Sequence, residues 1–139
     1  MPSSRKRHDS LDHMNSDIIP VSRQIAARYF EMWNTGDSSI AAEILSPGWL
    51  DHAHPEVTGP QAVQLAVERI RAAQPDLRFH IEAILGDADL VTVVGTTSRE
   101  PHPSLAATRL IWLFRLKNGQ LAEMWTYHDT SRPPANAAH

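Results

Sequence analysis

The alternation of apolar and polar residues is clearest near the C-terminus, where two apolar runs flank Asn118 and Gly119 and predict a β-hairpin over residues 107–130. Both turn residues tolerate the positive φ angles that a type I′ turn requires. A two-residue turn makes Lys117 face Gln120 and fixes the register of both strands. The predicted pairs are Leu116 with Leu121, Phe114 with Glu123, Trp112 with Trp125, Leu110 with Tyr127, and Thr108 with Asp129.

This register gives the hairpin two unlike faces. One face carries an aromatic row that ends in a carboxylate, and it comprises Trp112, Trp125, Tyr127 and Asp129. The other face is only half apolar and comprises Arg109, Ile111, Leu113, Arg115, Ala122, Met124, Thr126 and His128. Such a mixture is typical of a solvent-exposed surface or of a contact between subunits. Because apolar surroundings raise the pKa of a carboxyl group, the aromatic face makes Asp129 the leading candidate for acid/base chemistry.

Apolar residues that recur every three or four positions predict three helices ahead of the strands. The first helix has Ser22 as its N-cap and ends at Thr35-Gly36. Asp37 caps a short second helix, which the Ser-Pro-Gly sequence at residues 46–48 ends. Residues 49–53 form a short strand or bend, and a third helix opens at Pro60, since proline is favoured at the first helical position.

From Leu77 the apolar period changes to two, which predicts a half-buried strand. Its inward-facing residues are Leu77, Phe79, Ile81, Ala83 and Leu85. A turn at residues 86–89 leads into another strand over residues 90–97. Helices followed by strands predict an α+β fold, in which three N-terminal helices cover one face of a curved antiparallel sheet. Such an arrangement encloses a conical pocket in which a ligand can bind.

The length and composition of the chain exclude several classes of function. The 139 residues suit one domain, which we place at residues 17–131 between disordered tails at residues 1–16 and 132–139. A net charge of −3 argues against nucleic acid as a partner, and the lack of cysteine excludes disulfides and thiolate chemistry. No apolar run approaches the roughly 20 residues of a membrane span, and no secretory signal is evident. We therefore expect a cytoplasmic protein with no membrane partner.

Short motifs between residues 22 and 130 follow one another in a characteristic order. They are Trp33-Asn34-Thr35-Gly36-Asp37, Asp51-His52 ahead of Gly59-Pro60, Pro75-Asp76-Leu77-Arg78-Phe79, Gly86-Asp87-Ala88-Asp89-Leu90-Val91, Phe114-Arg115, Asn118-Gly119, and Glu123-Met124-Trp125 before Asp129. Together they resemble a SnoaL-like polyketide cyclase domain. That family belongs to the nuclear transport factor 2-like superfamily of cone-shaped α+β folds.

The resemblance implies a hydrophobic pocket between helices and sheet, a homodimer or higher homo-oligomer formed through the other face of the sheet, and no metal or organic cofactor. In the cyclases of this family the aspartate after the Glu-x-Trp motif is the general acid/base of an intramolecular aldol closure. That role would fall on Asp129. The implied substrate is a small apolar carbonyl compound such as a polyketide.

Fold membership does not define the reaction, so several alternatives stay open. Isomerisation of the ketosteroid isomerase type would use the same pocket. Epoxide hydrolysis would require two carboxylates and an arginine around a water, for which only Asp129 and Arg109 offer themselves. A ligand-binding or assembly protein without catalysis is the alternative from another class.

His52 and His54 lie in a polar loop at the expected mouth of the pocket. We predict that His52 or Tyr29 acts beside Asp129 by hydrogen-bonding a substrate oxygen. Two histidines two residues apart also resemble metal ligands, but no third ligand has a suitable spacing, so no metal site is predicted. We interpret Asp51 as a residue that caps the loop.

Aromatic residues are the main candidates for substrate binding, since ring stacking would favour a flat ligand. The predicted substrate-binding residues are Tyr29, Trp49, His54, Trp112, Trp125 and Tyr127. Aromatic stripes also form ordinary cores, which is the interpretation we favour for Trp33 and Phe79.

Overall fold

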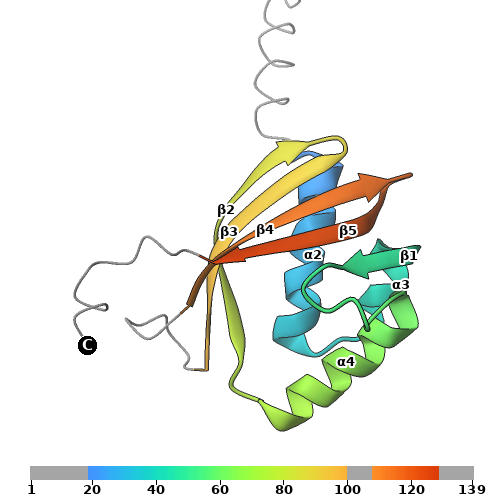
Figure 1. Cartoon of the computed structure of the whole chain (residues 1–139). Helices are drawn as coiled ribbons and strands as arrows, with labels where there is room; N and C mark the ends of the chain where they lie inside the picture. Colours follow the sequence, from blue (N-terminus) through green and yellow to red (C-terminus); the bar gives the residue numbers. More distant parts are fainter. Residues whose placement is uncertain (1–18, 100–107, 129–139) are drawn as a thin grey trace, which may run out of the picture.

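The computed structural model describes residues 19–99 and 108–128. The elements are α2 (Val21–Thr35), α3 (Ile40–Ile44), β1 (Leu45–Asp51), α4 (Pro60–Ala73), β2 (Arg78–Asp87), β3 (Leu90–Ser98), β4 (Thr108–Lys117) and β5 (Gln120–His128). The five strands form one curved, open sheet in the order β1-β5-β4-β3-β2, and buried residues of the helices pack against one of its faces (Figure 1). The fold is therefore of the predicted α+β class.

The arrangement of elements differs from the prediction at β1. This strand separates α3 from α4, and it pairs in parallel with β5, so the sheet is not wholly antiparallel. Residues 46–48, which predicted a break, lie inside the strand. An edge strand tolerates Pro47 because one side of such a strand needs no ladder partner for its backbone N–H.

Helix α2 begins at Val21, so the prediction of Ser22 as its N-cap is wrong. Pro20 occupies the N-cap position, and Ser22 is buried inside the helix. The predicted end is confirmed, because Gly36 adopts a left-handed φ of 81° and donates its N–H to the carbonyl oxygen of Met32. The predicted start of α4 at Pro60 is also confirmed.

The turn of the closing hairpin forms as predicted. Asn118 and Gly119 have positive φ angles of 51° and 76°, as a type I′ turn requires. Lys117 pairs with Gln120, as the two-residue turn predicts. The local turn chemistry therefore defines the first pairs of the hairpin.

Further along the hairpin the predicted register is wrong, because β5 contains a β-bulge. The pairing shifts by one residue after Leu121, which leaves Ala122 as the extra residue. The observed pairs beyond the bulge are Arg115 with Glu123, Phe114 with Met124, Leu113 with Trp125, Trp112 with Thr126, and Ile111 with Tyr127. Leu121 and Met124 are three residues apart, and both can be buried only if one extra residue restores the alternation.

The bulge reverses the predicted faces of β5. Met124 is buried with Trp112, although the two were predicted on opposite faces. Trp125 and Tyr127 instead lie on the outer face of the sheet, beside Leu113 and Ile111. The predicted row from Trp112 through Trp125 to Tyr127 is therefore wrong.

Strand β2 contains a second bulge. Ile81 pairs with Gly95 and Ala83 with Val94, which leaves Glu82 as the extra residue. Because the alternation shifts there, Ile84 packs against the core, whereas Leu85 is 56% exposed. The predicted burial of Ala83 and Leu85 on one face with Phe79 is therefore wrong.

Aromatic rings fill the layer between the helices and the sheet. The centroid of the Phe30 ring lies 4.7 Å from that of Trp112, 5.6 Å from that of Phe79 and 5.9 Å from that of Phe114. Trp49 and Phe114 are almost fully buried in the same cluster. In the described part of the chain, these rings occupy the interior that was predicted to be a pocket.

Replacing Gly95 with alanine should destabilise the fold. An added Cβ would lie 2.3 Å from the carbonyl oxygen of His80, a backbone atom held in the β2–β3 ladder. We expect the free energy of unfolding to fall by about 1–3 kcal/mol, the usual cost of overpacking, as measured by urea denaturation.

Gly48→Ala is the matched control, because an added Cβ there meets nothing within 4 Å. Equal stability of the two variants would contradict the close approach of the strands at Gly95.

Candidate functional site

Strand β1 divides the candidate residues between two faces of the sheet. Side chains alternate along a strand, so Trp49 and Asp51 point towards the helices, whereas Leu50 and His52 point towards the outer face. Trp49 is 1% exposed in the core, and the ring of His52 stacks on Trp125. Residues predicted to form one site therefore fall into two groups.

The inner group centres on the phenol of Tyr29. The ring is 5% exposed and lies 5.6 Å from Trp49 and 5.3 Å from Phe114, measured between ring centroids. Burial raises the pKa of Tyr29 well above its ordinary value, and the negative charge of Asp51 acts in the same direction. The phenol therefore stays protonated at neutral pH and can act only as a neutral hydrogen-bonding group.

Asp51, whose charge acts on this phenol, also binds the loop that follows β1. Its Oδ1 accepts the backbone N–H of Ala53 at 2.9 Å, which confirms the predicted loop-capping role. Its Oδ2 lies 3.4 Å from Nδ1 of His54, whose side chain is mostly exposed while that of Asp51 is mostly buried. We call Tyr29, Asp51 and His54 the inner cluster. It combines a buried donor, a carboxylate and an accessible imidazole.

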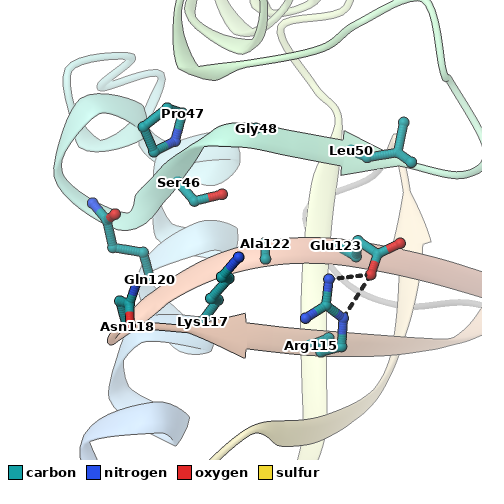
Figure 2. Close-up of a pocket in the computed structure, with 10 residues that line it drawn as sticks. All are labelled: Ser46, Pro47, Gly48, Leu50, Arg115, Lys117, Asn118, Gln120, Ala122 and Glu123. Atoms are coloured by element: carbon teal, nitrogen blue, oxygen red, sulfur yellow. Dashed lines mark hydrogen bonds and ion pairs between the residues drawn. The ribbon is translucent and has the colours of Figure 1, made fainter.

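A second cluster lies on the outer face, where Glu123 binds two partners. Nε2 of His52 donates to Oε2 of Glu123 at 2.8 Å, and Nε of Arg115 donates to Oε1 at 2.6 Å. Nη2 of Arg115 also contacts Oε1, so that two guanidinium nitrogens hold one carboxylate oxygen (Figure 2). The bonds from His52 and Arg115 lower the pKa of Glu123, which keeps this carboxylate ionised.

The imidazole of His52 is also held by Trp125. The two rings are nearly parallel, at an angle of 9°, and their centroids are 4.7 Å apart. We call Arg115, Glu123, His52 and Trp125 the outer cluster. His52 is thus engaged on the face of the sheet opposite to Tyr29.

The structure brings together only part of the predicted set. Tyr29 contacts Trp49 on the inner side, and His52 contacts Trp125 on the outer side. Trp112 is 3% exposed in the core.

Two further predicted residues lie apart from both clusters or outside the description. Tyr127 is 50% exposed on the outer face, where it pairs with Ile111. Asp129 lies outside the described residues. The hairpin register that placed Asp129 in a row with Trp112 does not hold for the described part of β5.

Glu123 and Arg115 were not predicted as site residues. The predicted register paired Glu123 with Phe114 and separated it from Arg115, whereas the bulge makes Glu123 and Arg115 direct partners. The signal that indicates the bulge is the three-residue spacing of the apolar Leu121 and Met124.

Residues 19–99 and 108–128 contain neither a group of metal ligands nor a membrane-spanning helix. Within these ranges, no three or more histidine, aspartate or glutamate side chains are grouped so that they could hold a metal ion. No helix there is both long enough and apolar enough to cross a membrane. The carboxylates of the two clusters are engaged with histidine, arginine and backbone N–H groups.

Glu123→Gln should destabilise the protein at neutral pH but not in acid. The pKa of Glu123 in the folded state lies below its ordinary value of 4.5, so its stabilising effect is present above that pH and disappears as the pH falls through the folded-state pKa. At pH 7 the free energy of unfolding should fall by about 1 kcal/mol, because the bonds of Glu123 are partly exposed to water.

Urea denaturation between pH 7 and pH 3 measures this difference, with the exposed Glu56→Gln as the matched control. A destabilisation that persists unchanged at pH 3 would contradict a role for the ionised carboxylate.

Known proteins share this architecture. The family model for the SnoaL-like domain matches residues 26–124. Similar solved structures include TsrD from Streptomyces laurentii, with 21% identity, a TM-score of 0.65 and coverage of 78% of this chain and 88% of that one. IdmH from Streptomyces antibioticus has 20% identity, a TM-score of 0.59 and coverage of 85% and 99%. A SnoaL-like polyketide cyclase from Agrobacterium tumefaciens has 14% identity, a TM-score of 0.63 and coverage of 81% and 94%.

At these identities the solved structures establish the fold alone, and a comparison with curated proteins gives no match. The family model, in contrast, spans well over half of the sequence. Together with the α+β architecture and the curved five-stranded sheet, this match shows that the chain belongs to the family of SnoaL-like domains.

Proposed function

We propose that this SnoaL-like protein is an acid/base enzyme that acts without a cofactor on an apolar carbonyl compound, such as a polyketide, in an aldol cyclisation or an isomerisation. The observation that carries the proposal is the phenol of Tyr29, which is buried among the rings of Trp49 and Phe114 and on which the charge of Asp51 acts. The SnoaL-like relative from Agrobacterium tumefaciens is a polyketide cyclase.

Tyr29 is the residue that we assign to polarise a substrate oxygen. A donor fixed in a dry, low-dielectric environment stabilises a developing oxyanion more strongly than water does. Burial keeps the phenol protonated, so it can donate to a carbonyl or enolate oxygen over the whole physiological pH range. His52 is a weaker candidate for this role, because its ring is held by Glu123 and Trp125 on the opposite face.

Asp129 is the proposed general acid/base, on the basis of its position after Glu123 and Trp125 in the family motif. Its carboxylate would take a proton from a carbon next to a carbonyl, and the electron pair would move onto the carbonyl oxygen that faces Tyr29. In an aldol closure the resulting carbanion attacks a second carbonyl, and Asp129 returns the proton to the new alkoxide. In an isomerisation the proton returns to another carbon.

A ligand-binding protein without catalysis is the second candidate. The close packing of Phe30, Phe79, Trp112 and Phe114 favours it, because these rings leave little room for a large substrate deep in the interior. An epoxide hydrolase is less well supported. In the described part of the chain, the arginine and carboxylate that contact each other near the candidate residues are Arg115 and Glu123, on the outer face.

The enzyme proposal predicts that the protein accelerates exchange of the α-protons of a bicyclic ketone in D₂O. With 2-tetralone as probe, Asp129→Asn should slow the exchange by about 10²–10⁴-fold, the range typical of a general base, and Tyr29→Phe by about 10²-fold. Proton NMR measures the rate, and circular dichroism checks the fold of each variant.

Asp76→Asn and Tyr127→Phe are the matched controls, because both side chains are exposed and lie outside the inner cluster. A wild-type rate equal to that of Asp129→Asn would refute the role of Asp129. Loss of exchange in Asp51→Asn but not in Asp129→Asn would identify Asp51 as the base instead.

We also propose that two copies of the chain associate through the outer face of the sheet. Four large apolar side chains on this face are 39–56% exposed: Leu85, Leu90, Ile111 and Tyr127. Paired strands place them around Leu113 and Val94, with Thr92 and Arg115 among them. Surfaces of this kind mark sites of association.

Ile111→Lys should therefore shift the protein towards the monomer, because it introduces a charge into the centre of this apolar surface. Sedimentation velocity measures the distribution of species. Leu65→Lys on α4 is the matched control, since Leu65 is 58% exposed on a helix instead of on the sheet. A wild-type protein that is monomeric at micromolar concentration would refute the proposed association.

A further inference from the structure

A hollow of about 420 Å³ lies beside the outer cluster, between the first half of β1 and the β4–β5 turn (Figure 2). It opens because the two neighbouring strands have different numbers of residues there. Between their paired positions, β1 advances from Leu45 to Leu50 while β5 advances only from Leu121 to Glu123. The surplus residues of β1, which include Ser46 and Pro47, therefore arch away from β5 and form one wall.

Among the described residues that line the hollow, positively charged side chains outnumber negatively charged ones. Among the described residues, Glu123 is the only carboxylate that lines it, and both oxygens of Glu123 are occupied by His52 and Arg115. The third guanidinium nitrogen of Arg115, Nη1, makes no hydrogen bond within the described residues, and it lies on the side nearer Lys117 (Figure 2). The ammonium group of Lys117 makes no ion pair or hydrogen bond in that part of the chain. Lys117 is thus left without a counter-charge among the described residues.

Neutral donors complete the lining. The side chains of Ser46, Asn118 and Gln120 line the hollow, and within residues 19–99 and 108–128 none of them has a hydrogen-bond partner. Pro47 and Leu50 supply apolar surface on the β1 side. The lining thus offers a charged donor, several neutral donors and a small apolar wall.

We propose that this hollow binds the carboxylate or phosphate group of a small molecule, with Lys117 as the main electrostatic contact. Charge-assisted hydrogen bonds to an anion are about twice as strong as neutral ones, so Lys117 and Nη1 of Arg115 define the position of the anionic group. Asn118 and Gln120 donate from the turn, and the apolar wall accommodates the body of the ligand. The hollow lies on the face of the sheet opposite to Tyr29, so this site is independent of the proposed acid/base chemistry.

Titration of the ¹⁵N-labelled protein with sodium phosphate, and separately with sodium acetate, tests the proposal when sodium chloride holds the ionic strength constant. We expect saturable shifts of the backbone amides of Gly48, Asn118, Gly119 and Gln120 with at least one of the two anions. A response to phosphate alone identifies a phosphate-bearing ligand, and a response to acetate alone identifies a carboxylate. Lys117→Gln should weaken the apparent affinity about tenfold, the effect of losing one charge-assisted bond.

Arg69→Gln is the matched control, because it removes the same charge from an exposed position on α4. Equal affinity of the Lys117→Gln and Arg69→Gln variants would overturn the proposal. The absence of saturable shifts with both anions in the folded wild-type protein would overturn it as well. Shifts that spread over Leu85, Leu90 and Ile111 would also overturn it, because they would indicate association through the outer face instead of binding in the hollow.

Discussion

A single extra residue in β5 determines which of its side chains face the core and which face the outer surface of the sheet. Leu121 and Met124 must both reach the core, yet three positions separate them, so Ala122 is accommodated as a bulge. Every side chain of β5 beyond Ala122 then lies on the face opposite to the one that uninterrupted alternation predicts. Glu123 and Trp125 therefore lie on the outer surface of the sheet, whereas Met124 is buried with Trp112 and Phe114.

Strand β1 extends this division to the candidate chemical groups. The strand lies parallel to β5 and alternates in the same way, so Asp51 joins Tyr29 on the inner side, while His52 meets Glu123 and Trp125 on the outer side. The inner cluster is buried, aromatic and suited to holding a neutral donor. The outer cluster is ionic, partly exposed and adjacent to a hollow lined by Lys117, whose ammonium group has no ion-pair partner among the described residues. The same pair of strands thus supports two chemically different surfaces.

Features with a local cause could be predicted from the sequence. The left-handed end of α2 at Gly36, the start of α4 at Pro60 and the turn at Asn118 and Gly119 each depend on the conformational preference of one or two residues. The family was recognisable from motifs spread over most of the chain.

The two bulges could not be derived from alternation alone. They depend on which residues of a strand must pack against the core, as Phe79 and Ile84 of β2 both do. An edge position also allowed residues 46–48 to stay in a strand despite their local preference for a break. The site prediction inherited the register error, which is why Trp125 and Tyr127 were grouped with Trp112 although they lie on the outer face of the sheet.

Nuclear Overhauser contacts between side chains test the register of β5 most directly. The structure predicts strong contacts between the ring protons of His52 and the indole of Trp125, whose centroids are 4.7 Å apart, and contacts between Trp125 and Leu113. It predicts none between the indoles of Trp112 and Trp125. Direct contacts between those two tryptophans, with none from His52 to Trp125, would contradict the bulge and the separation of the two clusters.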